Sequence, residues 1–207
     1  MVDSQVRPSD VTRYPIIAAM LAVPREAFVP DARRTVAYAE ENIEIAEGRV
    51  LLAPRSFAKL LNELDIEPHD IVLDLGCGLG YSAAVIARMA DTVVAVEEIE
   101  GMAEEAQALL SGLGIDNAAV IEGRLAEGAA KHGPYDVITI GGGVECVPQA
   151  ITDQLKEGGR IGAIFMEGDL GEARIGMKAE GEITWRHAFN ATAPVMPGFV
   201  RQREFAL

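Results

Sequence analysis

The sequence predicts an α/β fold with a mainly parallel sheet, and three observations carry that prediction. Residues 71–75 form an apolar run broken only by Asp74, residues 81–89 follow with helical spacing, and residues 92–96 form a second apolar run. Short apolar runs bounded by glycines are typical of buried strands. Strands that alternate with helical segments favour a parallel sheet with helices packed on it.

The turn between the first strand and its helix is rich in glycine. A dinucleotide fingerprint requires Gly-x-Gly-x-x-Gly, but here the glycines are Gly76, Gly78 and Gly80, and Tyr81 stands in the third slot. Asp74 lies two residues before the first glycine. The pattern D-x-G-x-G-x-G resembles the first motif of class I S-adenosylmethionine-dependent methyltransferases. A structural turn without a ligand and a nicotinamide or flavin site are the alternatives.

Composition narrows the class of protein. The chain has 207 residues, of which 49% are hydrophobic and 24% charged, and this is typical of a globular domain with a sizeable core. The net charge of −14 argues against a nucleic-acid partner, because neutralising phosphates requires clustered Lys and Arg. Residues 1–55 hold seven Arg against eight acids, so this quarter repels an anionic substrate least.

The ends and the cysteines point to the cytoplasm. The first ten residues carry acids and no apolar core, which is unlike a signal peptide, and no apolar run is long enough to span a membrane. Cys77 and Cys146 are isolated, which favours a reducing compartment and argues against a structural metal site. We therefore expect no metal and no membrane partner.

The amino-terminal quarter is predicted to be helical, followed by a short extended turn. Residues 9–23 contain an apolar helical stretch with Pro15 in its first turn, and residues 24–28 and 31–39 follow as short helices. Residues 42–54 read as two extended pieces joined at Gly48, and residues 55–64 as an amphipathic helix. Residues 1–55 are expected to extend the same domain as the core, residues 56–207.

Four segments together resemble protein-L-isoaspartate O-methyltransferase. They are VPREAFVP (23–30), the Ala37-Tyr38 pair, IEIAEGRVLLAP (43–54) and VLDLGCGLGYSAA (72–84). The resemblance implies a Rossmann-like class I methyltransferase with a mainly parallel seven-stranded sheet, helices on both faces and a helical amino-terminal extension. It also implies S-adenosyl-L-methionine as cofactor and the carboxylate of L-isoaspartyl residues in damaged proteins as acceptor.

The cofactor is expected at the carboxyl ends of the first two strands. Glu97 ends the second strand about twenty residues after the glycines, where a carboxylate can hold a ribose diol. Glu98 is the alternative, but the alternation of the strand favours Glu97. The predicted cofactor-binding residues are Asp74, Gly76, Cys77, Gly78, Gly80, Tyr81, Glu97, Glu98, Gly123, Arg124, Leu125 and Gly141.

The sequence departs from the family at the position that lies near adenine. The family usually carries Gly-Asp there, whereas this chain has Gly123-Arg124. A guanidinium cannot accept a hydrogen bond from the adenine amino group. Adenine recognition is therefore expected to use backbone groups of residues 123–125, or the ligand lies differently.

The second departure lies beside the acceptor. The family's turn resembles G-Q-T-x-S, with hydroxyls near the substrate carboxylate, but Val50 and Leu52 occupy those positions here. Losing one such donor can cost about a hundredfold in rate. Arg49, Arg55 or Ser56 is hypothesised to compensate by holding an acidic substrate. No strong general base is expected, because a carboxylate is already ionised at neutral pH.

The remaining elements complete the predicted sheet. Strands are expected at 118–121 and 136–143, the latter feeding a mobile loop at 141–147, followed by a helix at 148–155 and a strand at 160–166. Residues 173–178 and 183–189 read as an antiparallel hairpin at the far edge, and residues 194–207 as a closing segment packed through Phe199 and Phe205.

Three functions stay open on the sequence. The first is methylation of isoaspartyl residues in proteins or peptides, the second is methylation of another acceptor such as a small carboxylate, and the third is non-catalytic binding of S-adenosylmethionine. The acceptor and the oligomeric state are not determined by the sequence.

Overall fold

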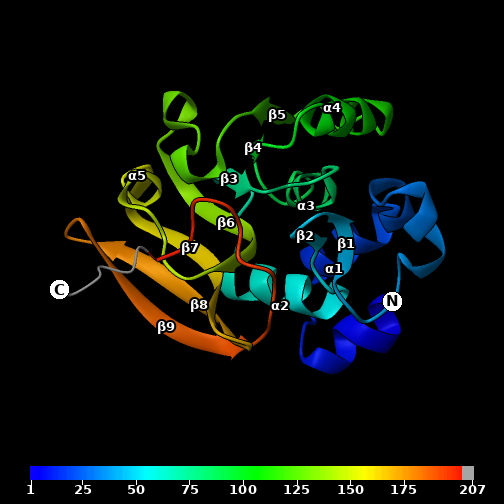
Figure 1. Ribbon diagram of the computed structural model, residues 1–207, viewed down its shortest axis with the longest axis horizontal. Helices are drawn as coiled ribbons and strands as arrows, with labels where there is room; N and C mark the ends of the chain where they lie inside the picture. Colours follow the sequence, from blue (N-terminus) through cyan, green and yellow to red (C-terminus); the bar gives the residue numbers. More distant parts are fainter. Residues whose placement is uncertain (202–207) are drawn as a thin grey trace.

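A seven-stranded sheet forms the centre of the computed structural model, which describes residues 1–201 (Figure 1). The strand order is β5-β4-β3-β6-β7-β8-β9. The first five strands in this order run parallel, whereas β8 and β9 are antiparallel at one edge. The strands are β3 (Ile71–Leu75), β4 (Thr92–Glu97), β5 (Ala118–Glu122), β6 (Tyr135–Val144), β7 (Leu155–Glu167), β8 (Leu170–Ala179) and β9 (Glu182–Asn190). The predicted sheet is confirmed, including its antiparallel far edge.

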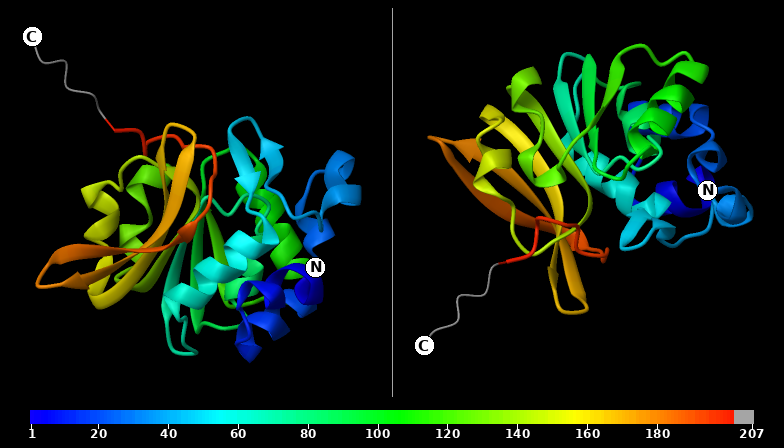
Figure 2. Two further views of the ribbon diagram at one scale, coloured as in Figure 1. Left: turned by 90° about the horizontal axis from the view of Figure 1, so that it is seen from below. Right: turned by 45° about the horizontal axis from the view of Figure 1, so that its top comes forward.

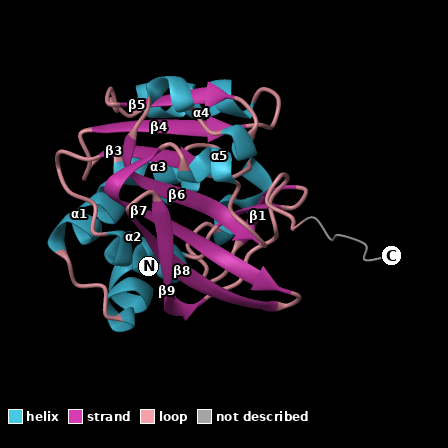
Figure 3. Cartoon of the chain, turned by 90° about the vertical axis from the view of Figure 1, so that its left-hand side faces the viewer, coloured by secondary structure: helices cyan, strands magenta, loops and turns pink. Residues whose placement is uncertain are grey.

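The order of the strands creates a switch point beside β3. The chain passes from β3 outward to β4 and β5, and then returns to the other side of β3 as β6. Figure 3 shows the resulting stack of strands from β5 to β9. In such sheets ligands bind at the carboxyl ends of the strands where the order reverses. The glycine turn after β3 lies at this point.

Helices cover both faces of the sheet, as predicted. Alternate residues of each strand point to opposite faces, and the two buried clusters separate accordingly. Val72, Val93 and Val137 join the cluster formed by α2 (Pro54–Leu64), α3 (Tyr81–Ile86), α4 (Met102–Gly112) and the amino-terminal segment. Leu73 and Ile138 join the cluster on the other face, where α5 (Gln149–Thr152) packs.

The amino-terminal segment is helical but mostly not α-helical. Only α1 (Tyr14–Ala22) is an α-helix, with Pro15 in its first turn as predicted. A π-helical turn (Val2–Val6) and 3₁₀ turns (Arg7–Ser9, Arg25–Phe28, Asp31–Val36) make up the rest. The buried Arg25 joins this segment to the core, because its guanidinium donates to the carbonyls of Ala37 and Leu52, each at 2.7 Å.

A separate two-stranded hairpin precedes α2. It consists of β1 (Ile43–Ala46) and β2 (Arg49–Leu51), which pair with each other and with no strand of the large sheet. Gly48 makes the turn with φ +66°, a conformation that glycine adopts readily. Figure 2 shows the hairpin (cyan) standing apart from the large sheet, on the side of the amino-terminal segment (blue).

Three predicted boundaries are wrong. The predicted loop at 141–147 is strand as far as Val144, because the closing segment pairs with it: the Gly143 amide donates to the Pro194 carbonyl at 2.8 Å, and the Met196 amide donates to the Gly143 carbonyl at 2.9 Å. The helix predicted at 148–155 covers only Gln149–Thr152, and β7 begins earlier than predicted, at Leu155. Phe199 is buried as expected. Phe205 lies outside the described residues.

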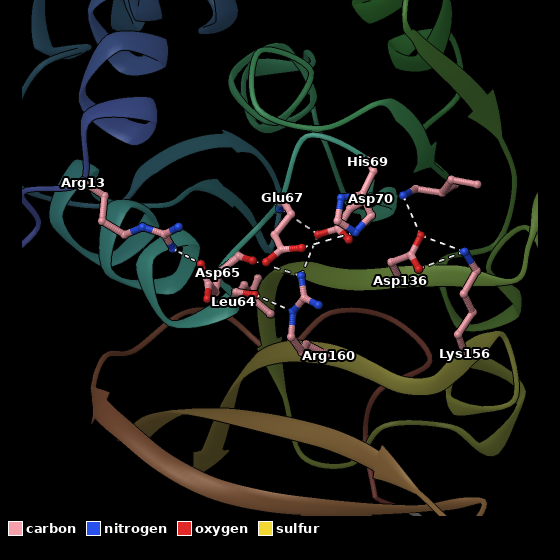
Figure 4. Close-up of polar contacts among 10 residues, drawn as sticks. Arg13, Leu64, Asp65, Glu67, His69, Asp70, Asp136, Lys156 and Arg160 are labelled. Atoms are coloured by element: carbon pink, nitrogen blue, oxygen red, sulfur yellow. Dashed lines mark hydrogen bonds and ion pairs between the residues drawn. The ribbon is translucent and has the colours of Figure 1, made fainter.

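Ion pairs join β7 to β6 and to the segment before β3 at the amino ends of the central strands, and a hydrogen bond joins β7 to α2 (Figure 4). The Arg160 guanidinium on β7 contacts the Asp70 carboxylate at 2.6 Å and donates to the Leu64 carbonyl at 2.8 Å. The Lys156 ammonium contacts both carboxylate oxygens of Asp136 at 2.8 Å. These contacts tie the amino ends of β3, β6 and β7 to one another, since the Ile71 amide also donates to Asp136 at 2.9 Å. In the described part of the chain, no helix is long and apolar enough to cross a membrane.

Candidate cofactor site

The glycine turn after β3 requires glycine for both conformation and space. Gly76, Gly78 and Gly80 have φ values of +78°, +57° and +97°. A Cβ built on Gly76 would lie 2.9 Å from the Arg49 guanidinium, and one on Gly78 would collide with Ile45. Gly80 caps the amino end of α3. The turn at residues 76–80, which we call the glycine cradle, therefore presents backbone without side chains at its three glycines, as their spacing predicts.

Asp74 points from β3 into this site, and only one of its two carboxylate oxygens is hydrogen-bonded within residues 1–201. Its side chain is fully buried, and one oxygen accepts a hydrogen bond from the Ser82 hydroxyl at 2.5 Å. The other oxygen, Oδ1, has no hydrogen-bond partner among residues 1–201. Burial raises the pKa of Asp74 to about 7, with the nearby Glu97 carboxylate acting in the same direction. A buried carboxylate oxygen without a partner indicates a place for a ligand donor.

Glu97 ends β4 and is also fully buried. The Arg49 guanidinium donates two hydrogen bonds to its carboxylate in a bidentate arrangement, Nη1 to Oε1 and Nη2 to Oε2, both 2.8 Å long. The backbone amides of Gly78, Glu98 and Ile99 donate to the same carboxylate at 2.8, 2.9 and 3.1 Å. Glu98 lies further out, and its carboxylate accepts from the Leu125 amide at 3.2 Å.

The structure places Arg49 differently from its predicted role. We expected this side chain to face an acidic substrate, but it is buried and paired with Glu97. Ser56 does not line the cavity beside the glycine turn, and Arg55 is exposed with its Nε 3.1 Å from the Ser9 hydroxyl. The compensation that we hypothesised for the missing hydroxyls has no support from these contacts.

The cavity beside Asp74 is small and largely apolar. Its volume is about 20 Å³, which is room for roughly one water molecule. Val50 and Leu52 line it, so the two positions that carry hydroxyls in the family do face the site. The lining residues are Phe28, Ile45, Val50, Leu51, Leu52, Phe57, Asp74, Gly76, Cys77, Leu79, Tyr81, Ser82, Thr139 and Gly141.

Residues 123–125 lie beside the end of β4. The Gly123 amide donates to the Glu97 carbonyl at 3.0 Å, and Leu125 is fully buried. The Arg124 side chain is 78% exposed and pairs with Glu127 at 3.3 Å. It therefore points away from the site, which leaves backbone groups of this segment as the groups nearest a ligand.

Several residues at the site were not predicted. Ser82 holds Asp74, Ile45 covers Gly78, and Thr139 of β6 lines the cavity. Met196 comes from the closing segment, and its sulfur would lie 2.9 Å from a Cβ at Gly76. Ser82 could have been found as a hydroxyl in the first turn after the glycines. Met196 has no local signal, because only the pairing with Gly143 brings it to the site.

The polar groups of this site fit S-adenosylmethionine, but the space beside them is filled. Asp74 and Glu97 provide carboxylate acceptors for the polar parts of such a ligand, and the glycine turn between them presents backbone without side chains. Arg49, Ile45 and Met196 occupy the volume over the glycines. The chemistry of the donors agrees with the cofactor, whereas the position of the hairpin does not leave room for it.

A larger groove lies elsewhere and contains none of the predicted site residues. It has a volume of about 900 Å³ and lies along β7, β8 and the segment that follows β9. Its charged lining residues are Glu145, Glu167, Asp169, Glu172, Arg174 and Arg201. It does not include the glycine turn after β3 and does not reach Asp74 or Glu97, so the smaller cavity is the candidate cofactor site.

Comparisons with known proteins identify relatives of this chain. The family model described as "Protein-L-isoaspartate(D-aspartate) O-methyltransferase (PCMT)" matches residues 3–170. Protein-L-isoaspartate O-methyltransferase 2 of Pelobacter propionicus is 37% identical over 161 residues, which are 78% of this chain and 72% of that protein. The Methanoculleus marisnigri protein-L-isoaspartate O-methyltransferase is 36% identical over 161 residues, 78% of this chain and 73% of its own.

Solved structures share the fold. A protein-L-isoaspartate O-methyltransferase superposes with a TM-score of 0.83 at 25% identity, covering 94% of this chain and 64% of that one. This chain thus spans less than two thirds of that protein's length. A Plasmodium falciparum protein in complex with S-adenosyl-L-homocysteine superposes with a TM-score of 0.79 at 20% identity, covering 93% of this chain and 94% of that one.

Proposed function

The chain belongs to the protein-L-isoaspartate(D-aspartate) O-methyltransferase family, and from this premise we propose that it is an S-adenosylmethionine-dependent methyltransferase. The proposed acceptor is the carboxylate of L-isoaspartyl residues in damaged proteins. The observation that carries the proposal is the pair of buried carboxylates, Asp74 and Glu97, on either side of a glycine turn at the switch point of the sheet.

Each of these groups has a proposed role toward the cofactor. The glycine turn gives close approach to backbone, and Glu97 offers a carboxylate to the ribose hydroxyls. Asp74 holds a donor of the ligand through its second oxygen. Gly141 of β6 closes the far side, because a Cβ there would lie 2.7 Å from the Gly76 carbonyl. Cys77, Tyr81 and the backbone of residues 123–125 complete the proposed cofactor contacts.

The chemistry requires alignment more than proton transfer. When bound, the cofactor supplies a methyl group on a sulfonium. The acceptor carboxylate is ionised at neutral pH, so no base has to activate it. The chain contributes an apolar, water-poor wall formed by Phe28, Val50, Leu52 and Phe57, which favours a reaction between two oriented groups.

A second candidate keeps the cofactor and changes the acceptor. Val50 and Leu52 present methyl groups where the family presents hydroxyls, so the wall offers little to a peptide carboxylate. A small carboxylate with an apolar body would suit this lining better. Both candidates place the protein in a reducing cytoplasm, which the unpaired Cys77 and Cys146 support, and neither requires nucleic acid, a membrane or a metal.

One assay separates these candidates. Radiolabelled S-adenosylmethionine is incubated with the protein and an isoaspartyl peptide, with the same peptide containing ordinary aspartate as the matched control. The proposal expects base-labile methyl label on the isoaspartyl peptide only. Titration with S-adenosylhomocysteine is run in parallel. Binding of S-adenosylhomocysteine without methylation of the isoaspartyl peptide would favour the second candidate, with a different acceptor. Absence of binding would overturn the proposal that the protein is a methyltransferase.

A further inference from the structure

Three side chains from distant parts of the sequence lie over the glycine turn. Ile45 and Arg49 come from the β1–β2 hairpin, and Met196 comes from the closing segment. Each has an atom within 2.9 Å of a Cβ built on Gly76 or Gly78. In dinucleotide-binding turns, glycine at such a position lets the backbone approach the ligand closely. Here the chain itself occupies the space over the glycines.

The hydrogen bonds that Glu97 accepts show why Arg49 and a ribose diol cannot bind it together. A carboxylate offers about four acceptor sites, and Glu97 already receives five N–H groups. Three of them are backbone amides fixed by the glycine turn and by the start of the segment after β4. The other two belong to Arg49. A ribose diol can therefore reach the Glu97 carboxylate only if the Arg49 guanidinium leaves it.

The element that carries Arg49 is built as a separate unit. The hairpin pairs only with itself, and its turn is the glycine at position 48. Next to the hairpin, the Asn42 side chain accepts from the Ala53 amide at 2.8 Å and donates to the Thr192 carbonyl at 2.7 Å. Withdrawal of the hairpin thus breaks no backbone hydrogen bond between strands of the seven-stranded sheet, although it breaks the two side-chain bonds from Arg49 to Glu97. It removes Ile45 and Arg49 from the cradle together.

We propose that the β1–β2 hairpin is a gate over the cofactor site, and that Arg49 competes with the cofactor for Glu97. The cofactor binds only the open arrangement, so the affinity is lowered by the fraction of molecules that are closed. This inference rests on the proposed function, because a gate has meaning only if S-adenosylmethionine binds here.

The test compares three variants in calorimetric titrations with S-adenosylhomocysteine. Arg49→Gln removes the competing charge and is expected to bind at least about tenfold more tightly than the wild type. Arg49→Lys keeps a charge without the two-pronged geometry, so it should lie between the two. Arg160→Gln also removes an arginine from a buried carboxylate, that of Asp70, but at the amino ends of the strands, opposite the cofactor site. This matched control should lower Tm and leave the affinity unchanged.

Hydrogen exchange supplies a readout that does not depend on the ligand. Without S-adenosylhomocysteine, amides of residues 43–51 should exchange faster in Arg49→Gln than in the wild type, because the hairpin has lost its anchor on Glu97. Arg160→Gln should leave exchange in this segment unchanged. If Arg49→Gln does not fold, the same two measurements on Arg49→Lys decide the question.

The outcomes separate the gate from the proposed function. Weaker binding in Arg49→Gln would make Arg49 a ligand contact and overturn the gate, and so would an unchanged affinity. Unchanged hydrogen exchange in the hairpin would also overturn it. If S-adenosylhomocysteine binds neither the wild type nor any variant, the proposed function itself fails and the gate fails with it.

Discussion

The two ends of the central sheet each carry an arginine on a buried carboxylate, yet their surroundings differ. At the amino ends, Arg160 pairs with Asp70 and also donates to the carbonyls of Leu64 and Asp65 (Figure 4). At the carboxyl ends, and within residues 1–201, the Arg49 guanidinium donates to Glu97 alone, and one carboxylate oxygen of the nearby Asp74 has no hydrogen-bond partner.

The difference teaches how to distinguish a structural pair from one that competes with a ligand. Arg160 bridges rigid elements of the large sheet and α2, and its side chain is 21% exposed. Arg49 comes from a hairpin outside that sheet, is only 4% exposed and lies against bare glycine backbone. The chemistry of the two pairs is alike, so their roles follow from what lies around them.

Among the variants that test this comparison, Glu97→Gln is expected to change the unfolding free energy most. The change leaves the buried Arg49 guanidinium without a counter-charge, and such a loss costs about 3–5 kcal/mol of unfolding free energy. Urea denaturation measures it. The double variant Arg49→Gln with Glu97→Gln should recover part of the loss, since both charges are gone. If the double variant is no more stable than Glu97→Gln, the pair does not act as a unit.

The next effect concerns catalysis and is specific to the carboxyl ends. Val50→Thr with Leu52→Ser restores hydroxyls to the wall of the cavity and should raise kcat on an isoaspartyl peptide by up to about a hundredfold. Steady-state kinetics measures the change. The reference variant Val120→Thr alters a half-buried residue of β5 that does not line the cavity, and it should not raise kcat. An unchanged rate in the double variant would show that the missing hydroxyls do not limit the reaction.

The pH dependence of stability is expected to reside at the carboxyl ends as well. Burial raises the pKa of Asp74 to about 7, above its value in the unfolded chain. The folded state therefore binds the extra proton, and its contribution to stability is lost as pH rises from about 4 to about 7.

Asp74→Asn removes this titration. Between those pH values the unfolding free energy of the wild type should fall relative to that of the variant, by on the order of 1 kcal/mol per pH unit. Denaturation at several pH values, compared between the two proteins, measures the slope. A constant difference across the range would mean that Asp74 is ionised in the folded state throughout.

The smallest effect should come from Asp70→Asn at the amino ends. Arg160 keeps its carbonyl partners and is partly solvated, so we expect a loss of only about 1–2 kcal/mol. Affinity for S-adenosylhomocysteine should not change. If Asp70→Asn weakened that affinity, the two ends of the sheet would not be functionally distinct.

Much of the fold could be predicted because its signals are local. The apolar runs of β3 and β4, the glycines between β3 and α3, and Pro15 in the first turn of α1 each depend on neighbouring residues. The same local logic placed Glu97 at the end of its strand. The pairing of Gly143 in β6 with the closing segment escaped prediction, because it depends on residues about fifty positions later.

By itself the sequence determined the parallel sheet, the glycine turn and the two carboxylates beside it, since strand periodicity and positive φ are properties of short stretches. Only the tertiary structure decided what covers that turn. The pairing of Arg49 with Glu97 spans 48 positions, and Met196 reaches the site only through the bonds between Gly143 and the closing segment. Such contacts leave no local pattern, because they arise when separately formed elements pack against one another.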